Sequence, residues 1–199
     1  DISRFSKQDE VPYDFIRKRL SILVSREDEH VILTKGALAN VLEVCTKVKT
    51  DTGVVEISHA REGILQIFRE LSEKGFRVLG LSCKNIQANV CISRDEADMT
   101  FLGFLVFFDP PKEGIASTIS NLAGLGVSLK VITGDNRLVA ASISQKVGLG
   151  ESKILTGNEI RLSSDDALQR QVQDASVFAE IEPNQKERLI IALRKNGNV

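Results

Sequence analysis

The sequence predicts an α+β unit built on an antiparallel sheet, followed by a parallel α/β unit. In the first half of the chain, β-rich segments are separated by short charged turns, which is typical of hairpins. In the second half, helical and strand patterns alternate, which indicates βαβ crossovers and a parallel sheet. Pro110 and Pro111 stand where the pattern changes, and they restrict the backbone there. We therefore expect residues 1–109 and 110–199 to form separate domains.

The expected elements of the first domain are a hairpin, two helices and two later strands. The hairpin rests on two β-rich runs that flank a charged turn, and the first helix rests on apolar residues spaced i, i+3, i+4 and i+7. Ser58 can cap the second helix, and Gly75 can end it. The predicted elements are strands 21–25 and 31–34, helices 36–46 and 58–75, and strands 77–83 and 100–108.

The second domain is expected to alternate helix and strand. Ser163 or Ser164 can cap one helix, and Pro183 can begin the last. The predicted elements are helix 112–125, strand 127–132, helices 136–147 and 165–172, strand 176–179 and helix 183–194.

Composition excludes several classes of protein. Twenty-six basic residues against 27 acidic residues give a net charge of −1, so no overall positive field exists to hold nucleic acid or an anionic membrane. No apolar run approaches the roughly 20 residues of a spanning helix, and residues 1–7 lack the apolar core of a signal peptide. Three cysteines without a CxxC pair and two histidines indicate reduced thiols and no metal site. We expect a soluble, cytosolic chain.

The segment 131–136 is the most informative for chemistry. A buried strand ends at Thr133, Gly134 permits a tight turn, and a helix follows Asp135 at once. In open α/β sheets ligands bind at the carboxyl ends of strands, and a helix N-terminus favours phosphate. The alternative is a plain strand–turn–helix connection in which Asp135 or Asn136 caps the helix.

Two lysines are further candidates for a phosphate site. Lys186 lies one turn inside the helix that Pro183 begins, where its charge could neutralise a phosphoryl group. Lys35 and Gly36 follow the strand over 31–34 and open a helix, and a glycine there lets a ligand approach the backbone closely. The alternatives are a surface lysine paired with a nearby carboxylate and an ordinary helix start with an exposed lysine.

Two aromatic residues precede three cations in the segment 12–19. Tyr13 and Phe15 could stack on a base while the cations contact phosphates, in a chain with only 5% aromatic residues. The alternative is that the aromatic side chains belong to the core.

Order and spacing of five short segments resemble the successive cytoplasmic motifs of P-type cation-transporting ATPases. The resemblance covers essentially the whole chain, and residues 10–24 look most like the bacterial magnesium-transporting branch. The five segments are Lys-Gly-Ala at 35–37, Gly-Phe-Arg-Val-Leu at 75–79, Asp-Pro-Pro-Lys at 109–112, Thr-Gly-Asp-Asn at 133–136 and Pro-Asn-Gln-Lys at 183–186.

This resemblance implies a fold for each half of the chain. Residues 1–109 would be most of the nucleotide-binding domain, with its antiparallel sheet, truncated at its start. Residues 110–199 would be part of the phosphorylation domain, which has a haloacid dehalogenase-like parallel α/β fold.

The resemblance also implies roles for individual residues. Tyr13, or alternatively Phe15, would stack on adenine. The other nucleotide contacts would come from Lys18, Lys35, Gly36, Arg77 and Lys112. Thr133, Gly134 and Asp135 would lie beside the transferred phosphoryl group, which Lys186 would stabilise. Such roles suit phosphoryl transfer, which depends mainly on positioning and charge neutralisation.

Two parts of the family pattern are missing from the 199 residues. The phosphorylated aspartate in Asp-Lys-Thr-Gly-Thr does not occur, and neither does the Gly-Asp-Gly-x-Asn-Asp loop that holds Mg²⁺. Glu180 stands where many relatives carry arginine. We therefore expect a fragment that is inactive alone, from a protein whose membrane helices and actuator domain are its partners.

The predicted function is that of the ATP-binding and phosphoryl-transfer part of a cation transporter, with magnesium as the ion, at the cytoplasmic side of the membrane. ATP and Mg²⁺ are the expected ligands, and nucleic acid is not. One alternative is a soluble haloacid dehalogenase-type phosphatase with a cap domain. Another is a regulatory nucleotide-binding module without catalysis.

Overall fold

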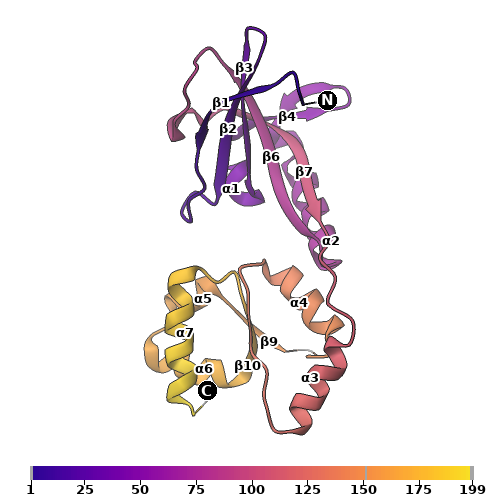
Figure 1. The fold of residues 1–199 in the computed structure, drawn as a ribbon, viewed down its shortest axis with the longest axis vertical. Coiled ribbons are helices and arrows are strands. Elements are labelled where there is room, and N and C mark those ends of the chain that lie inside the picture. Colours follow the sequence, from indigo (N-terminus) through magenta and orange to yellow (C-terminus); the bar gives the residue numbers. More distant parts are fainter. Residues whose placement is uncertain (1, 151, 198–199) are drawn as a thin grey trace. The chain divides into compact units, whose positions relative to one another are not determined.

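A computed structural model describes residues 2–150 and 152–197 of the chain (Figure 1). Its contacts divide the chain into two compact units. The first unit comprises the described residues up to Phe68 together with Val78–Phe107, and the second comprises Arg69–Arg77 and the described residues from Phe108 onward. Helix α2 (Arg61–Glu73) contributes residues to both units.

The first unit is built on a seven-stranded sheet of strand order β1-β2-β3-β6-β7-β4-β5. The pairs β1–β2, β2–β3, β3–β6 and β4–β5 are antiparallel, whereas β4 and β7 are parallel. The sheet is therefore mostly antiparallel, as predicted. Its strands are β1 (Ser6–Val11), β2 (Arg19–Arg26), β3 (Glu29–Ala37), β4 (Cys45–Thr50), β5 (Gly53–Glu56), β6 (Arg77–Ile86) and β7 (Met99–Phe107).

The predicted hairpin is confirmed, but the predicted helix over 36–46 is largely wrong. Strands β2 and β3 pair in register from Arg19 opposite Gly36 to Arg26 opposite Glu29. Helix α1 spans only Leu38–Leu42, and the chain then enters β4. Thr46, Val48 and Thr50 are β-branched and favour the strand, so the helical spacing ends sooner than the apolar residues suggest. Strands β1 and β5 were not predicted at all.

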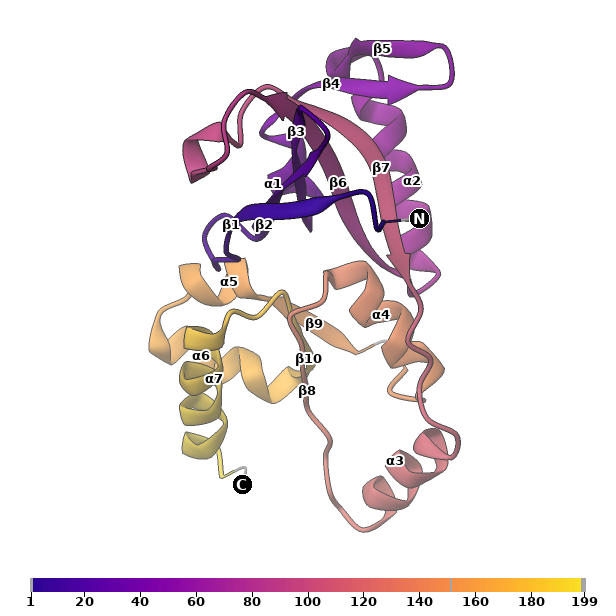
Figure 2. The same cartoon turned by 45° about the horizontal axis from the view of Figure 1, so that its top comes forward.

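The second helix begins later than predicted because Ile57–His59 forms a short 3₁₀ turn, η1, and α2 starts at Arg61. Both helices contribute to one apolar core with the sheet, and α2 runs alongside β7 in both views (Figures 1 and 2). Fully buried members of this core include Leu23 of β2, Ile32 of β3 and Val41 of α1.

The two faces of β2 and β3 differ in burial because side chains alternate along a strand. Ser21 and Thr34 lie on the buried face and are completely inaccessible to solvent. Leu20 and Leu33 lie on the opposite face and are half-buried, and Lys35 on that face is exposed. This outer face is therefore the one that can receive a ligand.

The second unit has a three-stranded sheet of order β8-β10-β9, in which both strand pairs are parallel. Strand β8 is shorter than the predicted strand over 127–132, and β9 and α5 were not predicted. The elements are α3 (Ile115–Gly124), β8 (Val131–Ile132), α4 (Arg137–Lys146), β9 (Lys153–Thr156), α5 (Gly157–Leu162), α6 (Asp165–Asp174), β10 (Ala175–Ala179) and α7 (Pro183–Lys195).

Both faces of β10 are covered, which is typical of parallel sheets. Phe178 packs in the core formed with α5, α6 and α7, and Val177 and Ala179 pack with Ala140 of α4. The helix ends follow the predicted signals: the Ser164 hydroxyl accepts a hydrogen bond from the Ala167 N–H at the start of α6, and proline occupies the first turn of α7. The carboxyl ends of β8 and β10 consequently present two neighbouring loops.

Gly36 is a position where a side chain cannot be accommodated. A Cβ built there would overlap the carbonyl oxygen of Lys18 and the Cβ of Arg19. We expect Gly36→Ala to lower the free energy of unfolding of the first unit by about 1–3 kcal/mol, the usual cost of overpacking. Urea unfolding followed by circular dichroism measures this change.

Gly63 provides the matched control. It lies in α2, and nothing lies within 4 Å of a Cβ built there. Gly63→Ala should raise stability by about 0.5–1 kcal/mol because alanine favours the helix. Equal effects of the two substitutions would show that the close approach at Gly36 is not maintained in solution.

Candidate functional site

The aromatic residues singled out in the sequence lie in a compact turn before β2. The Asp14 carboxylate accepts hydrogen bonds from the backbone N–H groups of Ile16, at 2.8 Å, and Arg17, at 2.7 Å. The Lys18 N–H donates to the Asp14 carbonyl at 2.9 Å. We call residues 12–18 the aromatic turn. Its hydrogen bonds fix the main chain, so the aromatic side chains have defined positions.

Tyr13 and Phe15 are on the surface of this turn. They are 48% and 59% exposed, and their rings meet edge to face with centroids 5.4 Å apart. The alternative that they belong to the core therefore does not hold. Exposed ring faces can stack on a planar base.

A buried carboxylate lies beneath the aromatic turn. Glu96 is 3% exposed, and both of its oxygens accept from Arg17 Nη1 at 2.6 Å. Arg19 Nε donates to it at 2.9 Å and Ser21 Oγ at 2.7 Å. The hydrogen bond to Glu96 raises the pKa of Arg17 above its ordinary value. Sequence reasoning missed Glu96, which lies more than 70 positions from its partners in an unremarkable polar stretch.

Lys18 and Lys35 lie at the same end of the β2–β3 pair. The carbonyl of Lys18 accepts from the Ala37 N–H at 2.9 Å, and Lys35 is directly opposite Leu20 on one side and Leu81 on the other. Lys18 has φ of +50°, a left-handed conformation that turns the chain into β2. The exposed Lys35 ammonium thus stands between two half-buried leucines.

Gly36 has a structural role within the chain itself. It is buried, and the space a side chain would need is filled by residues 18 and 19. Across β3 and β6, Gly36 is paired with Gly80, whose own missing side chain would press on Val41 at 3.1 Å. The two glycines together form a flat strip on the inner face of the sheet.

The Thr133–Asp135 loop follows β8 and is held by its own side chains. Thr133 Oγ1 donates to Asp135 Oδ2 at 2.8 Å and accepts from the Asp135 N–H at 3.1 Å. Asn136 caps α4 by accepting from the Val139 N–H at 3.0 Å. Of the two caps considered, the structure therefore has Asn136, and Asp135 is available for other contacts.

The loop after β10 is joined to the Thr133–Asp135 loop by main-chain hydrogen bonds. The Glu180 N–H donates to the Asp135 carbonyl at 2.8 Å, and the Ile181 N–H donates to the Thr133 carbonyl at 3.0 Å. The Glu180 carboxylate accepts from the Arg137 N–H at 3.2 Å, at the first residue of α4. Glu180, which departs from the family pattern, thus accepts a hydrogen bond from a main-chain N–H group that has no partner within the first turn of the helix.

Asp135 also forms an ion pair within the second unit. Arg77, at the end of the segment Arg69–Arg77, donates through Nε to Asp135 Oδ1 at 2.8 Å and through Nη2 to Oδ2 at 3.0 Å. The Asp135 side chain is only 18% exposed, whereas that of Arg77 is half-exposed. Two sequence candidates, one assigned to nucleotide and one to phosphoryl, therefore contact each other directly.

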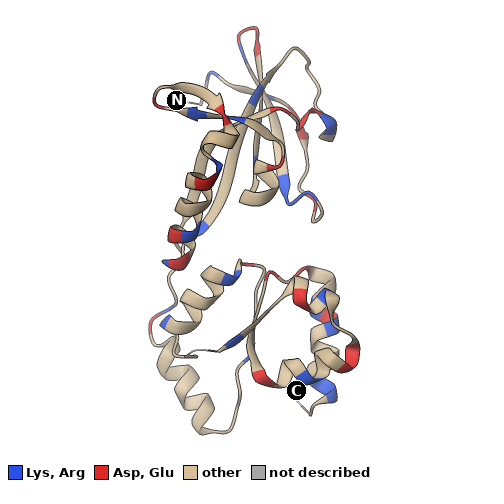
Figure 3. Ribbon diagram, turned by 180° about the vertical axis from the view of Figure 1, so that it is seen from behind, with Lys and Arg blue, Asp and Glu red and all other residues tan. Residues whose placement is uncertain are grey.

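The remaining sequence candidates are exposed. Gly134 lies in the loop after β8, Lys112 lies between β7 and α3, and Lys186 lies in the first turn of α7. Both units carry basic and acidic residues, whereas α3 carries neither (Figure 3). Within residues 2–150 and 152–197, no three His, Cys, Asp or Glu side chains are grouped so as to hold a metal ion.

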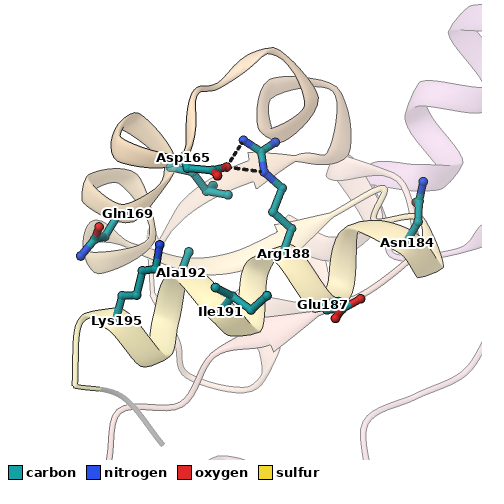
Figure 4. A pocket seen from close by; sticks show the side chains of 9 residues that line it. Asp165, Gln169, Asn184, Glu187, Arg188, Ile191, Ala192 and Lys195 are labelled. Carbon is teal, nitrogen blue, oxygen red and sulfur yellow. Dashed lines mark hydrogen bonds and ion pairs between the residues drawn. The ribbon is translucent and has the colours of Figure 1, made fainter.

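A surface pocket of about 250 Å³ lies between α6 and α7, and of the motif residues singled out in the sequence its lining includes Asn184 (Figure 4). Arg188 points across it to Asp165, with Nη2 and Oδ1 2.8 Å apart. Arg188 also donates to the carbonyls of Ile160, at 2.7 Å, and Ser163, at 2.6 Å. The polar groups of Arg188 hold α5 and α6 against α7, so we assign the pocket no chemical role.

Comparison with known proteins identifies the class to which these features belong. The family described as P-type ATPase, cytoplasmic domain N, matches residues 3–114, and the chain belongs to the P-type cation-transporting ATPases.

Individual relatives include the magnesium-transporting branch of this class, which the resemblance of residues 10–24 predicted. The chain is 35% identical to the magnesium-transporting ATPase, P-type 1, of Escherichia coli K12 over 99% of its own length, and 37% identical to that of Salmonella typhimurium LT2 over 98%. Identity to calcium-transporting ATPase 1 of Bacillus cereus is 29% over 96% of the chain. The chain spans 22% of the length of each of these relatives. Among the helices described here, none has the length and apolar character to cross a bilayer.

The pH dependence of the aromatic turn follows from Asp14. The pKa of the Asp14 carboxyl lies below the usual range, mainly because the Arg17 N–H donates a hydrogen bond to the carboxylate. A lowered folded-state pKa means that the charged carboxylate stabilises the turn above its unfolded pKa, and that this contribution is lost as pH falls through the folded value. The amide shifts of Ile16 and Arg17 should therefore titrate with a midpoint below that of an ordinary aspartate.

Asp14→Asn should abolish this acid transition in the NMR titration. Asp9→Asn is the matched control, because Asp9 accepts from the N–H groups of Glu10 and Cys91 instead. A midpoint at the ordinary aspartate value, or a transition that survives Asp14→Asn, would contradict the assignment.

Proposed function

We propose that this chain is the cytoplasmic ATP-binding and phosphoryl-transfer part of an ATP-driven cation transporter. The first unit acts as a nucleotide-binding domain, and the second as part of a haloacid dehalogenase-like phosphorylation domain. The names of the magnesium-transporting relatives support Mg²⁺ as the transported ion. The remainder of the parent protein, with its membrane helices and actuator domain, is the partner that this part needs for transport.

The observation that carries the proposal is the arrangement at one end of the β2–β3 pair. There the exposed rings of Tyr13 and Phe15 lie in a turn that leads through Lys18 into β2, opposite the end of β3 that bears Lys35. An adenine needs an aromatic or apolar surface, and a triphosphate needs cations. Leu20 and Leu81 beside Lys35 supply further apolar surface.

The second unit offers a phosphoryl group a different set of contacts. The Thr133 hydroxyl, the main chain at Gly134 and the Asp135 carboxylate are gathered in one loop at the carboxyl end of a parallel strand. Lys186 in the first turn of α7 provides a cation for the transferred group. Mg²⁺ is usually held by one or two carboxylates together with phosphate oxygens. Both Asp135 oxygens accept from Arg77, so among the described residues we assign no protein ligand to the Mg²⁺ that accompanies ATP.

Arg77 and Lys112 are the contacts that we assign to the phosphates at the moment of transfer. The pairing of Arg77 with Asp135 shows that this guanidinium is already bound to a carboxylate, so a phosphate competes with Asp135 for it. The bidentate geometry available to arginine suits either partner.

A soluble phosphatase with a cap domain is the weaker candidate. It requires a nucleophilic aspartate in an Asp-x-Asp motif, and the 199 residues contain no such motif. The family match over residues 3–114 lies on the very segment that such a phosphatase leaves unexplained.

ATP binding can be followed at Tyr13, because the chain has one tyrosine and no tryptophan. Stacking contributes about 1–3 kcal/mol per base, and with one charge-assisted contact we expect a Kd between millimolar and tens of micromolar, about 4 to 6 kcal/mol. Titration with ATP should quench tyrosine fluorescence, with absorption by the nucleotide corrected against N-acetyltyrosinamide. Amide shifts measured by NMR should identify Tyr13 and Lys35 together.

Lys35→Ala should weaken binding about tenfold, because a hydrogen bond to a charged group contributes about 1.5 kcal/mol or more. Lys47→Ala is the control, since Lys47 is an exposed lysine on β4 of the same sheet. The nucleotide site lies elsewhere if Lys35→Ala and Tyr13→Ala both bind ATP like the parent chain.

Hydrolysis is a separate matter from binding. Because the 199 residues contain no Asp-Lys-Thr-Gly-Thr string, we expect no phosphate release above background and no acid-stable phosphoenzyme with labelled ATP. A phosphorylated residue found by mass spectrometry after incubation would overturn this expectation, and Asp135→Asn would then be the first variant to examine.

A further inference from the structure

We infer that Glu96 is the positioning residue of the ATP site: through Arg17 and Arg19 it fixes the aromatic turn and Lys18 in the geometry that binds nucleotide. The inference rests on the proposed function of the first unit. Glu96 is buried and does not itself meet ATP, so its action is through the two arginines.

The Glu96 carboxylate is fully occupied by donors from one short stretch of chain. Arg17, Arg19 and Ser21 supply its hydrogen bonds, at distances between 2.6 and 2.9 Å. The Ser21 hydroxyl is in turn 2.6 Å from that of Thr34 on β3. One carboxylate therefore joins the segment before β2, the start of β2 and, through Ser21, the strand that carries Lys35.

Arg17 transmits this restraint to the aromatic residues. While Nη1 is bound to Glu96, its Nη2 donates to the Pro12 carbonyl at 2.7 Å and its Nε pairs with Asp14. Pro12 and Asp14 are the two neighbours of Tyr13. The Arg17 guanidinium thus holds the backbone on both sides of the proposed stacking residue, and Glu96 holds the guanidinium.

Arg19 transmits the restraint to the proposed phosphate contacts. Its Nε is bound to Glu96 and its Nη1 donates to the Asn40 carbonyl at 3.1 Å. Lys18 lies between the two clamped arginines, with a left-handed φ of +50° that costs energy for a residue with a side chain. The clamps on both sides compensate for this cost and keep Lys18 turned as it is.

A carboxylate suits this place for an electrostatic reason as well. Arg19 is 9% exposed, and a buried guanidinium needs a counter-charge. Glu96 supplies that charge. It also keeps both guanidinium groups engaged inside the unit, so that the outward-facing cation at this end of β3 is Lys35.

The experiment compares ATP affinity and stability in variants of the same chain. Glu96→Gln is nearly isosteric but removes the charge, and its amide donors oppose those of the arginines. Arg17→Lys keeps a positive charge beside Glu96 but cannot also reach Pro12 and Asp14. Both should weaken ATP binding about fivefold or more, measured from the ATP-dependent amide shift of Lys35 by NMR, a probe that remains when the single tyrosine is replaced. In the Tyr13→Ala background both should have little further effect on that affinity, because coupled sites are non-additive.

Lys84→Met is the matched control for a general loosening of the same loop. Lys84 Nζ donates to the Ala97 carbonyl at 2.8 Å, next to Glu96, without contacting either arginine. It should lower the unfolding midpoint while leaving ATP affinity unchanged. If Lys84→Met weakens ATP binding as much as Glu96→Gln does, Glu96 acts only through loop stability and the inference is wrong.

The outcomes separate the inference from the proposed function. If the unaltered chain shows no ATP-dependent change at Tyr13, the proposed function fails before any variant is made. If the unaltered chain binds ATP but Arg17→Lys, folded by circular dichroism, binds it equally well, the positioning role fails and the proposed function stands. Additive effects of Glu96→Gln and Tyr13→Ala would likewise overturn the positioning role.

Discussion

The organisation of the first unit depends on a single desolvated carboxylate, that of Glu96. Withdrawing a carboxylate and a guanidinium from water costs several kcal/mol per ion, and only good geometry with further hydrogen bonds offsets this cost. Here two arginines and a serine meet that requirement at short distances. Because removal of one partner from such a cluster typically costs roughly 3–5 kcal/mol, the cluster is sensitive to any change of its members. Its members consequently tie the segment before β2 to the residues just before β7.

In the second unit, main-chain hydrogen bonds fix the positions of the two loops that carry the candidate phosphoryl contacts. The loops after β8 and β10 are joined through the carbonyls of Thr133 and Asp135, and the Glu180 carboxylate closes the first turn of α4. Such backbone contacts do not depend on the identity of most side chains. The chemically useful groups of this loop, the Thr133 hydroxyl and the Asp135 carboxylate, also bond to each other. A ligand that engages them would replace side-chain contacts within the loop, while the main-chain hydrogen bonds remain.

Sequence reasoning succeeded where the determinants are local. The β2–β3 hairpin, the caps at Ser164 and Pro183 and the segments of the family resemblance all depend on neighbouring residues. It failed where pairing between segments far apart in the sequence determines the secondary structure. Residues Cys45–Thr50, for example, form a strand that pairs with the much later strand β7. Strand β1 is polar except at Val11 and pairs at the edge of the sheet, so no apolar alternation marks it. Glu96 could not be found either, because its importance arises only when the chain brings it to Arg17 and Arg19. A glutamate just before an apolar strand does not by itself indicate that its carboxylate is buried.

The glycine strip formed by Gly36 and Gly80 has a consequence for how this sheet can diverge between proteins. On the inner face, Gly36 is closed to a side chain because residues 18 and 19 occupy the space, and at Gly80 a side chain would crowd Val41 and Leu38. Variation that preserves the fold is thereby directed to the outer face, at Leu20 and Leu81 on either side of Lys35. These two positions could change size and polarity while the scaffold stays the same. The inner strip therefore acts as a fixed template that leaves the preference for one nucleotide over another to be tuned on the opposite surface.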